Sequence, residues 1–162
     1  MSALLVAGLG LLAGCGGGTR TVIVGTPPRS APTATVAPKA AAAQPAVSLG
    51  AFQSPSGNIG CMIIGASARC DIVHRSWSAP ARPSSCPPVV DFGQGLIVGR
   101  SGAARVVCAG DTARDPTSPR LPYGSASEVE GFACVSRRTG MTCTARTSGH
   151  GFFLSAQSYR LF

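Results

Sequence analysis

The sequence predicts an all-β, mainly antiparallel domain, a small barrel or sandwich linked by three disulfides. From Ala51 onward, short apolar runs rich in Val, Ile, Phe and Cys alternate with Gly, Pro, Ser and Asn, a texture typical of short strands joined by turns. No long stretch shows the periodicity of an amphipathic helix. Six cysteines lie in this part of the chain, an even number that is typical of a disulfide framework.

Seven segments have the composition of strands, and turn-forming residues bound each of them. They are Asn58–Ile63, Arg69–His74, Gly95–Val98, Arg105–Ala109, Gly131–Ser136, Met141–Arg146 and Gly151–Ser155. We interpret Gly93–Gly95 as a turn, and not as a phosphate loop, because no Lys-Ser/Thr pair follows it. A single helical turn is expected at most, near Ser155–Tyr159.

The N-terminus has the pattern of a lipoprotein signal peptide. An apolar run over residues 3–13 is followed at once by Gly14-Cys15, so that its end forms the motif Leu12-Ala13-Gly14-Cys15. Small residues before the cysteine let a signal peptidase approach the bond, and the run is too short for a transmembrane helix, which needs about 20 residues. We therefore expect residues 1–14 to be removed and Cys15 to carry acyl groups, on the extracytoplasmic face of the cell membrane. Met1-Ser2 lacks a positive side chain, which leaves an uncleaved anchor or a buried helix as alternatives.

Residues 15–50 are predicted to form a tether between Cys15 and a domain at 51–162. The segment is rich in Gly, Pro and Ala and has no sustained amphipathic period. A tether of this kind spans roughly 30–35 Å as a flexible coil and up to ~110 Å as polyproline. The alternative is that it packs on the domain.

The six domain cysteines are spaced so that two pairs flank stretches of eight residues, each with a glycine near its middle. This is the pattern of a hairpin in which a disulfide joins facing positions of the two strands. We therefore pair Cys61 with Cys70 and Cys134 with Cys143, which leaves Cys86 with Cys108. Fifteen connectivities are possible for six cysteines. The spacings lack the tight pairs of a zinc site, so neither a metal nor another cofactor is expected.

The charge is basic throughout and comes almost entirely from arginine. The chain has a formal net charge of +8, and eleven arginines against six acids after residue 50 leave +5 for the domain. A basic exported domain is attracted to anionic headgroups and wall polymers. No run of basic residues interleaved with aromatics occurs, so we expect no nucleic-acid partner. The predicted partners are the membrane, through Cys15, and an anionic envelope polymer or an envelope protein, bound by a monomer.

A set of distinctive motifs follows residue 50 in a fixed order. They are Phe52-Gln53-Ser54-Pro55-Ser56-Gly57-Asn58-Ile59, Arg69-Cys70-Asp71, Trp77, Arg82-Pro83, Cys86-Pro87, Gly93-Gln94-Gly95-Leu96, Val107-Cys108-Ala109-Gly110-Asp111-Thr112, Leu121–Gly124, the Cys134/Cys143 pair, Gly149-His150-Gly151-Phe152 and Tyr159-Arg160-Leu161-Phe162. In this combination the chain resembles an uncharacterised family of secreted proteins and lipoproteins from actinobacteria. The resemblance covers residues 51–162 and implies an envelope location. It implies no activity, and no functional residue is carried over from it.

Groups able to catalyse a reaction are scarce. His150 lies between two glycines, and with Asp111 and a serine it is the one candidate for a triad of a hydrolase acting on the cell wall. No G-x-S-x-G nucleophile elbow is present, and the plainer interpretation is a histidine that hydrogen-bonds a neighbouring turn. Glu128 and Glu130 share one face of a strand, as paired carboxylates do in glycosidases, but surface ion pairs are the expected alternative.

The remaining acids lie in a loop. Asp111 and Asp115 are in a stretch rich in Pro and Arg, where we expect Arg114 to screen them. With the six cysteines in disulfides, a thiol nucleophile is not expected either.

Four residues are candidates for binding: Trp77, Arg137, Arg138 and His150. Trp77 is expected either to cover the core or to present a platform for a sugar or peptide. Ser54–Asn58 has the composition of a turn and also offers backbone N–H groups to an anion. The function predicted from the sequence is a non-enzymatic binding module displayed outside the membrane. A hydrolase using His150 and Asp111, and a purely structural envelope protein, are the alternatives.

Overall fold

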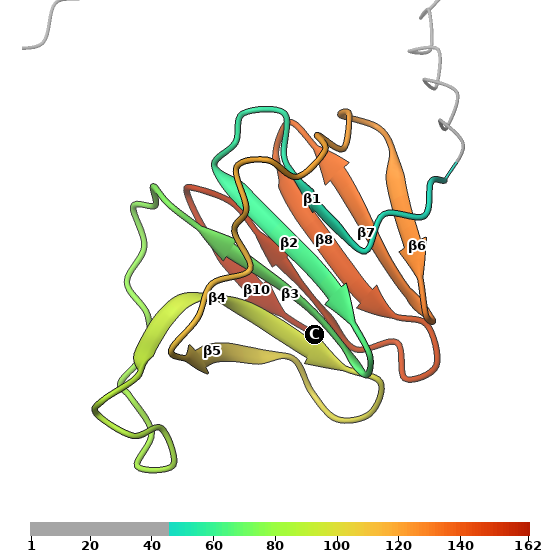
Figure 1. Cartoon of the computed structure of the whole chain (residues 1–162). Helices are drawn as coiled ribbons and strands as arrows, with labels where there is room; N and C mark the ends of the chain where they lie inside the picture. The colour runs from blue at the N-terminus through green and yellow to red at the C-terminus, as the bar shows by residue number, and fades with distance from the viewer. Residues whose placement is uncertain (1–45) are drawn as a thin grey trace, which may run out of the picture. The chain divides into compact units, whose positions relative to one another are not determined.

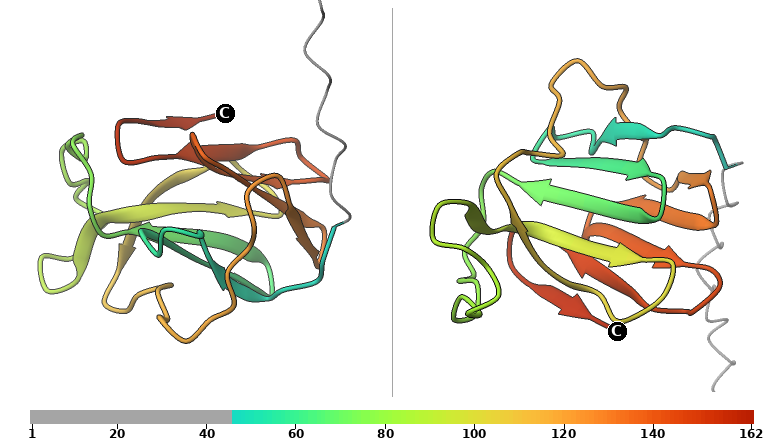
Figure 2. Two further views of the ribbon diagram at one scale, coloured as in Figure 1. Left: turned by 90° about the horizontal axis from the view of Figure 1, so that it is seen from above. Right: turned by 60° about the horizontal axis from the view of Figure 1, so that its bottom comes forward.

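The computed structural model describes residues 46–162, which form two five-stranded antiparallel sheets packed face to face (Figures 1 and 2). The first sheet has the strand order β1-β2-β3-β4-β5 and the second β10-β9-β8-β7-β6, so each sheet is a simple meander. The predicted all-β fold with three disulfides is therefore confirmed, and of the two predicted architectures it is the sandwich, because the sheets do not close into a barrel.

The first sheet consists of β1 (Ala51–Gln53), β2 (Ile59–Ile64), β3 (Ser67–Ile72), β4 (Asp91–Gly99) and β5 (Arg105–Ala109). The second consists of β6 (Ala126–Val129), β7 (Phe132–Arg137), β8 (Gly140–Ala145), β9 (Gly151–Leu154) and β10 (Tyr159–Leu161). A long loop joins β3 to β4, and the segment from β5 to β6 crosses from one sheet to the other (Figure 1).

The three disulfides are the pairs that the cysteine spacing predicts. Cys61 faces Cys70 across β2 and β3, and Cys134 faces Cys143 across β7 and β8, with a Cα–Cα distance of 4.0 Å in both pairs. These bonds meet in the core, where the sulfurs of Cys70 and Cys143 lie 3.5 Å apart. Each sheet thus carries a covalent link between its second and third strands, and the two links pack against each other.

The core fills the space between the sheets with side chains that alternate along the strands. Phe52, Phe132 and Phe152 are its largest members and are at most 1% exposed. Such alternation is expected when each sheet has one buried face. Three aromatic rings and two disulfides therefore form the centre of a domain whose remaining core residues are mostly small or aliphatic.

The structure differs from the sequence prediction in several elements. β1, β6 and β10 were not predicted. The expected turn at Gly93–Gly95 lies inside β4, at an irregularity in the pairing of β4 with β5. Gly95 is needed there because an added Cβ would lie 2.2 Å from the carbonyl oxygen of Cys70. The helical turn expected near Ser155–Tyr159 is instead a turn held by the Ser155 hydroxyl, which accepts from the N–H of Ser158.

Two short extended segments cover the outer edges of β1 and β6. Val47 pairs with Ser127 of β6, and Leu49 packs against the core. On the other sheet, Gln53 of β1 forms backbone hydrogen bonds with Pro119 and Leu121. The predicted domain begins at residue 51. Residues 47 and 49 already contact it.

The predicted signal peptide, Cys15 and most of the predicted tether lie outside the described residues. Within 46–162, no helix is long and apolar enough to span a bilayer.

Candidate functional site

A polar pocket of about 210 Å³ opens at one end of the sandwich, where three turns and one loop converge. We call this end the loop end. The pocket is lined by Ser54, Ser56, Asn58, Ile59, Tyr123, Arg137, Arg138, Thr139, Gly140, Ser155, Ala156 and Gln157. The β1–β2, β7–β8 and β9–β10 turns and the strand residues that adjoin them supply all of these residues except Tyr123, which belongs to the segment between β5 and β6.

The β1–β2 turn is fixed by hydrogen bonds within itself. The Ser54 hydroxyl accepts from the N–H of Ile59 at 3.1 Å, and the Ser54 carbonyl accepts from Gly57 at 2.8 Å. Gly57 has a φ of 75°, in the left-handed region that glycine adopts without strain. The Ser56 hydroxyl lies 3.1 Å from that of Ser54. The turn therefore presents serine hydroxyls to the pocket on a well-ordered backbone.

The segment around Trp77 holds the β9–β10 turn in place. The indole N–H of Trp77 donates to the carbonyl of Ser155 at 2.8 Å, and the N–H of Ser76 donates to that of Ala156. The Trp77 ring packs on Tyr159 with centroids 4.6 Å apart, and it also contacts the core. Trp77 therefore covers part of the core and has its polar group committed to the backbone, and its use as a platform for a ligand stays a prediction.

Arg137, Arg138 and Tyr123 give the pocket its charge and its aromatic surface. The Arg138 guanidinium lies over the Tyr123 ring at 5.1 Å from its centroid, an arrangement favoured by cation–π attraction. Both arginines are exposed and follow one another at the tip of the β7–β8 hairpin. Two of the four residues predicted to bind a ligand therefore do lie together in a pocket.

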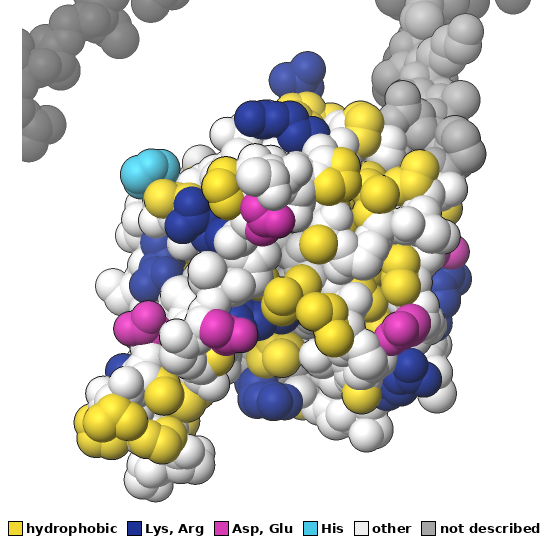
Figure 3. Space-filling view, viewed as in Figure 1, with side chains coloured by type: hydrophobic (Ala, Val, Ile, Leu, Met, Phe, Trp, Pro, Cys, Tyr) yellow, Lys and Arg dark blue, Asp and Glu magenta, His cyan; other side chains and the backbone are white. Residues whose placement is uncertain are grey.

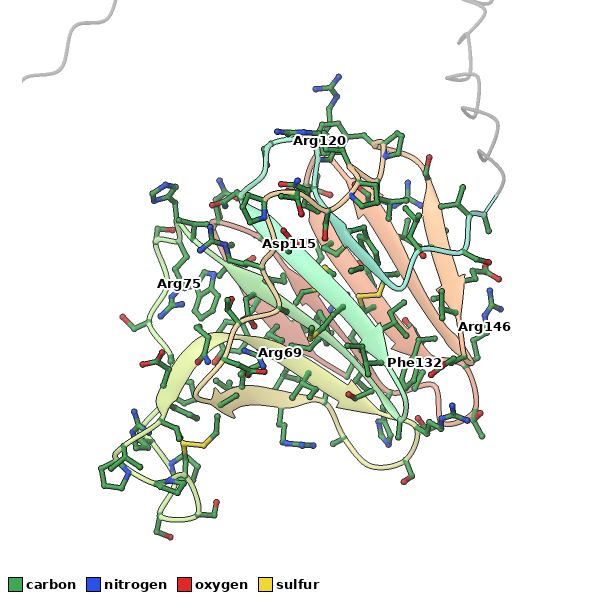
Figure 4. All side chains as sticks on the ribbon, viewed as in Figure 1. Arg69, Arg75, Asp115, Arg120, Phe132 and Arg146 are labelled. Atoms are coloured by element: carbon green, nitrogen blue, oxygen red, sulfur yellow. A yellow bond between two sulfur atoms is a disulfide. The ribbon has the colours of Figure 1, made fainter. Side chains whose placement is uncertain are left out.

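The ion pairs of the domain are distributed unequally between its two ends. At the end opposite the loop end, Arg100 pairs with Glu130 and Arg146 with Glu128. At the loop end, Arg120 donates to the carbonyl of Pro55 and has no carboxylate partner within residues 46–162. Figure 4 shows Arg120 and Arg146 at these opposite ends, and Figure 3 shows basic side chains gathered at the top of the view.

Arg137 and Arg138 also form no ion pair in the described part of the chain. Asp115 is held by Thr117, whose hydroxyl donates to it at 2.6 Å and lowers the pKa of this carboxyl. The loop end is thus a basic surface whose charges are not neutralised internally.

A buried ion pair anchors the segment that follows β5. Asp71, 1% exposed, accepts two hydrogen bonds from Arg69, at 2.9 and 2.7 Å, one from the Thr112 hydroxyl and one from the Ala113 N–H. Arg69 also reaches the carboxylate of Asp111 at 2.6 Å. Both carboxylate oxygens of Asp71 are hydrogen-bonded within the fold, so we assign this cluster a structural role.

The cluster also shifts two pKa values. Burial opposes the charge on Arg69, but its hydrogen bonds to the two aspartates outweigh burial and raise the pKa of Arg69. The hydrogen bond from Arg69 lowers the pKa of Asp111. The sequence predicts that Arg114 screens Asp111. In the structure Arg69 does so instead.

The structure does not bring His150 and Asp111 together. His150 lies in the turn between β8 and β9, where its N–H donates to the Ser148 hydroxyl. The carboxylate of Asp111 is bound by Arg69 on the other sheet. The geometry of the described residues therefore assembles no triad from these two side chains, and His150 lies outside the pocket that holds Arg137 and Arg138.

The other two carboxylate candidates are engaged in surface ion pairs, the alternative that the sequence left open. Glu128 and Glu130 belong to two ion pairs, with Arg146 and Arg100 respectively. Cys61, Cys70 and Cys143 bring three sulfurs close together, but each sulfur is in a disulfide and offers no thiolate to a metal.

The fold and the pocket define a small, disulfide-linked β-sandwich with a basic polar pocket at one end. The chain belongs to a family of unknown function, DUF6636, whose model matches residues 33–162. Comparison with curated proteins and with solved structures finds no match.

Proposed function

We propose that this protein is a membrane-anchored envelope lipoprotein whose sandwich is a non-enzymatic binding module, and that the loop end binds an anionic envelope polymer. The observation that carries the proposal is the pair Arg137–Arg138, which lines a polar pocket without an acidic partner in the described residues. Arginine is well suited to phosphate and carboxylate groups because its fork of donors binds them in a bidentate manner.

The rest of the pocket fits a polymer of polyol or sugar units. Ser56 and Gln157 place a hydroxyl and an amide group beside the two arginines, and Tyr123 adds an aromatic face of the kind that packs on sugar rings. The basic charge of the domain would attract such a polymer from a distance, and salt would weaken that attraction. The hydrolase alternative receives no support from the geometry, because His150 and Asp111 belong to different contacts.

The binding part of the proposal is tested by titrating the domain with polyglycerol phosphate, with neutral dextran as the comparison ligand. Replacing both Arg137 and Arg138 by Gln removes two charges from the pocket, and replacing both Arg100 and Arg146 by Gln removes two charges from the opposite end. Because each lost charge-assisted hydrogen bond costs about 1.5–3 kcal/mol, the pocket variant should bind at least roughly tenfold more weakly.

The control variant should bind within about twofold of the wild type, and raising the salt from 50 to 200 mM should weaken binding. Equal losses in the two double variants would place the polymer elsewhere, and equal binding of dextran would show that charge has no part in recognition.

The anchor is tested separately by intact mass spectrometry of the protein isolated from its host. The lipobox Leu12-Ala13-Gly14-Cys15 predicts a mature chain that starts at Cys15 and carries acyl groups. A Cys15→Ser variant should be released from the membrane fraction. An unmodified Cys15 in membrane-bound protein would refute this part of the proposal.

A further inference from the structure

An apolar slot opens between the two sheets on the side where β5 and β10 form their outer edges. It measures about 560 Å³ and is lined by Pro80, Ala81, Pro83, Ser85, Cys86, Phe92, Ala104, Arg105, Val106, Cys108 and Leu161. Figure 1 and the right panel of Figure 2 both show the end of β10 beside the β4–β5 hairpin. The slot is distinct from the pocket at the loop end and shares no residue with it.

One wall of the slot is the loop between β3 and β4, from Pro80 to Cys86, and the other is formed by residues of the two sheets. Val106 pairs with the core residue Leu96, and Leu161 pairs with the core residue Phe152, so both point between the sheets. In a closed sandwich such positions are buried. Here Leu161 is 38% exposed, and Val106 is only partly buried. The core of this domain therefore continues into the slot and is open to solvent there.

The strands that flank the slot also have free edges. Within residues 46–162, the backbone of Arg105–Ala109 hydrogen-bonds to no backbone other than that of β4, and the backbone of Tyr159–Leu161 bonds only to β9. The opposite side of the sandwich is different, because Val47 covers β6 and Pro119–Leu121 covers β1. An uncovered edge beside exposed apolar side chains is the arrangement to which extended chains add as strands.

Charge indicates what such a strand would carry between its apolar residues. The exposed arginines Arg105 and Arg160 lie on the outer faces of β5 and β10. On β5 this face also carries Val107, which is 2% exposed. No acidic residue lines the slot. A strand that adds to β5 would place every second side chain in the slot and the intervening ones beside Arg105, since cross-strand neighbours lie on the same face.

We propose that the β5 edge is a docking site for an extended peptide from a partner protein, with apolar residues alternating with acidic ones. Backbone hydrogen bonds to β5 would supply the register, the slot would receive the apolar side chains, and Arg105 would pair with an acidic one. Added in this way, the peptide covers the edge of β5, as Val47 covers β6 and Pro119–Leu121 covers β1 on the opposite side of the sandwich. This inference is independent of the polymer site at the loop end.

The experiment titrates the folded domain with a labelled peptide of about seven residues that alternates valine and glutamate, followed by fluorescence anisotropy. Three other peptides are compared: one with the same composition in two blocks, one with lysine in place of glutamate, and one N-methylated throughout. The alternating peptide should bind best, and the N-methylated peptide should not bind, because a strand addition depends on main-chain hydrogen bonds.

Variants place the peptide on the domain. Arg105→Glu should weaken binding about fivefold, the size of an opposed cross-strand charge pair, and Leu161→Asp should weaken it about tenfold by placing a charge in the slot. Val89→Asp is the matched control. Val89 is 91% exposed and belongs to the β3–β4 loop, which also supplies residues to the slot, but Val89 itself does not line the slot. These positions are exposed, and circular dichroism verifies that each variant is folded.

Four results would overturn the proposal. Three of them concern the peptide. They are equal binding of the N-methylated peptide, equal loss in Val89→Asp and Leu161→Asp, and no peptide binding at all by a folded domain. Binding of laurate to the slot without binding of the peptide would assign the slot to an amphiphile and would also overturn it.

Discussion

The buried pair Arg69–Asp71 offers the sharpest test of how the segment after β5 is held. Asp71→Ala removes a carboxylate that accepts four hydrogen bonds, from Arg69, Thr112 and Ala113. It leaves the side chain of Arg69, 8% exposed, without its main partner. Breaking a buried ion pair by removing one partner costs about 3–5 kcal/mol. We therefore expect the free energy of unfolding to fall by about that amount.

Urea denaturation measures this loss, with Glu128→Ala as the matched control. Glu128 forms its ion pair with Arg146 at the surface, where such pairs contribute about 0–1 kcal/mol. The denaturant slope should stay the same in both variants, so that the midpoints report stability. If Asp71→Ala and Glu128→Ala differ by less than about 1 kcal/mol, the pair does not stabilise the fold as we describe.

Three further predictions concern the disulfides, β4 and pH. Loops closed by bonds at separations of 9, 22 and 9 residues give a chain-entropy stabilisation of up to about 9 kcal/mol; full reduction should therefore unfold the domain near 37 °C, and an unchanged melting curve would contradict this. Gly95→Ala should destabilise the domain by about 1–3 kcal/mol in urea melts, because its Cβ would clash with Cys70 and Asp71. Gly110→Ala is the control, because an added Cβ there would meet only Val90, at an ordinary contact distance of 3.7 Å. Because Arg69 lowers the pKa of Asp111, this carboxylate stabilises the fold above its ordinary pKa, and the contribution is lost as the pH falls through the lowered value. The difference between wild type and Asp111→Asn should therefore begin to shrink below about pH 4 and disappear only below the lowered pKa, and a difference independent of pH would contradict the assignment.

The paired hairpins were predictable because their information is local. Eight residues between Cys61 and Cys70, with a glycine near the middle, specify facing positions on two strands. β1 and β10 escaped prediction because three residues are too few to show an alternating pattern. β6 escaped because its sequence, Ala-Ser-Glu-Val, has few of the residues typical of strands, whereas β9, of equal length, has two phenylalanines. The pairing of β1, β6 and β10 depends on neighbours in the sheet and not on their own composition.

The site was predictable only in part, for a related reason. Arg137 and Arg138 were identified as candidates because they are adjacent in the sequence. Their neighbours in the pocket, Ser54 and Gln157, come from other turns that only the fold brings near. Nothing local indicates that Arg69 binds Asp111, 42 residues further along.

The same limit applies to the apolar slot. Leu161 and Val106 belong to different sheets, and their exposure follows from the open side of the sandwich. A sequence pattern shows which face of a strand is apolar. It does not show that the face lacks a cover.

The most direct test of the binding account is a map of backbone amide shifts during titration of the ¹⁵N-labelled domain with polyglycerol phosphate. The account predicts that shifts concentrate at the three turns around the pocket, from Ser56 to Asn58, from Arg137 to Gly140 and at Gln157. Shifts that concentrate around Arg100 and Arg146, or that spread evenly over the domain, would contradict it.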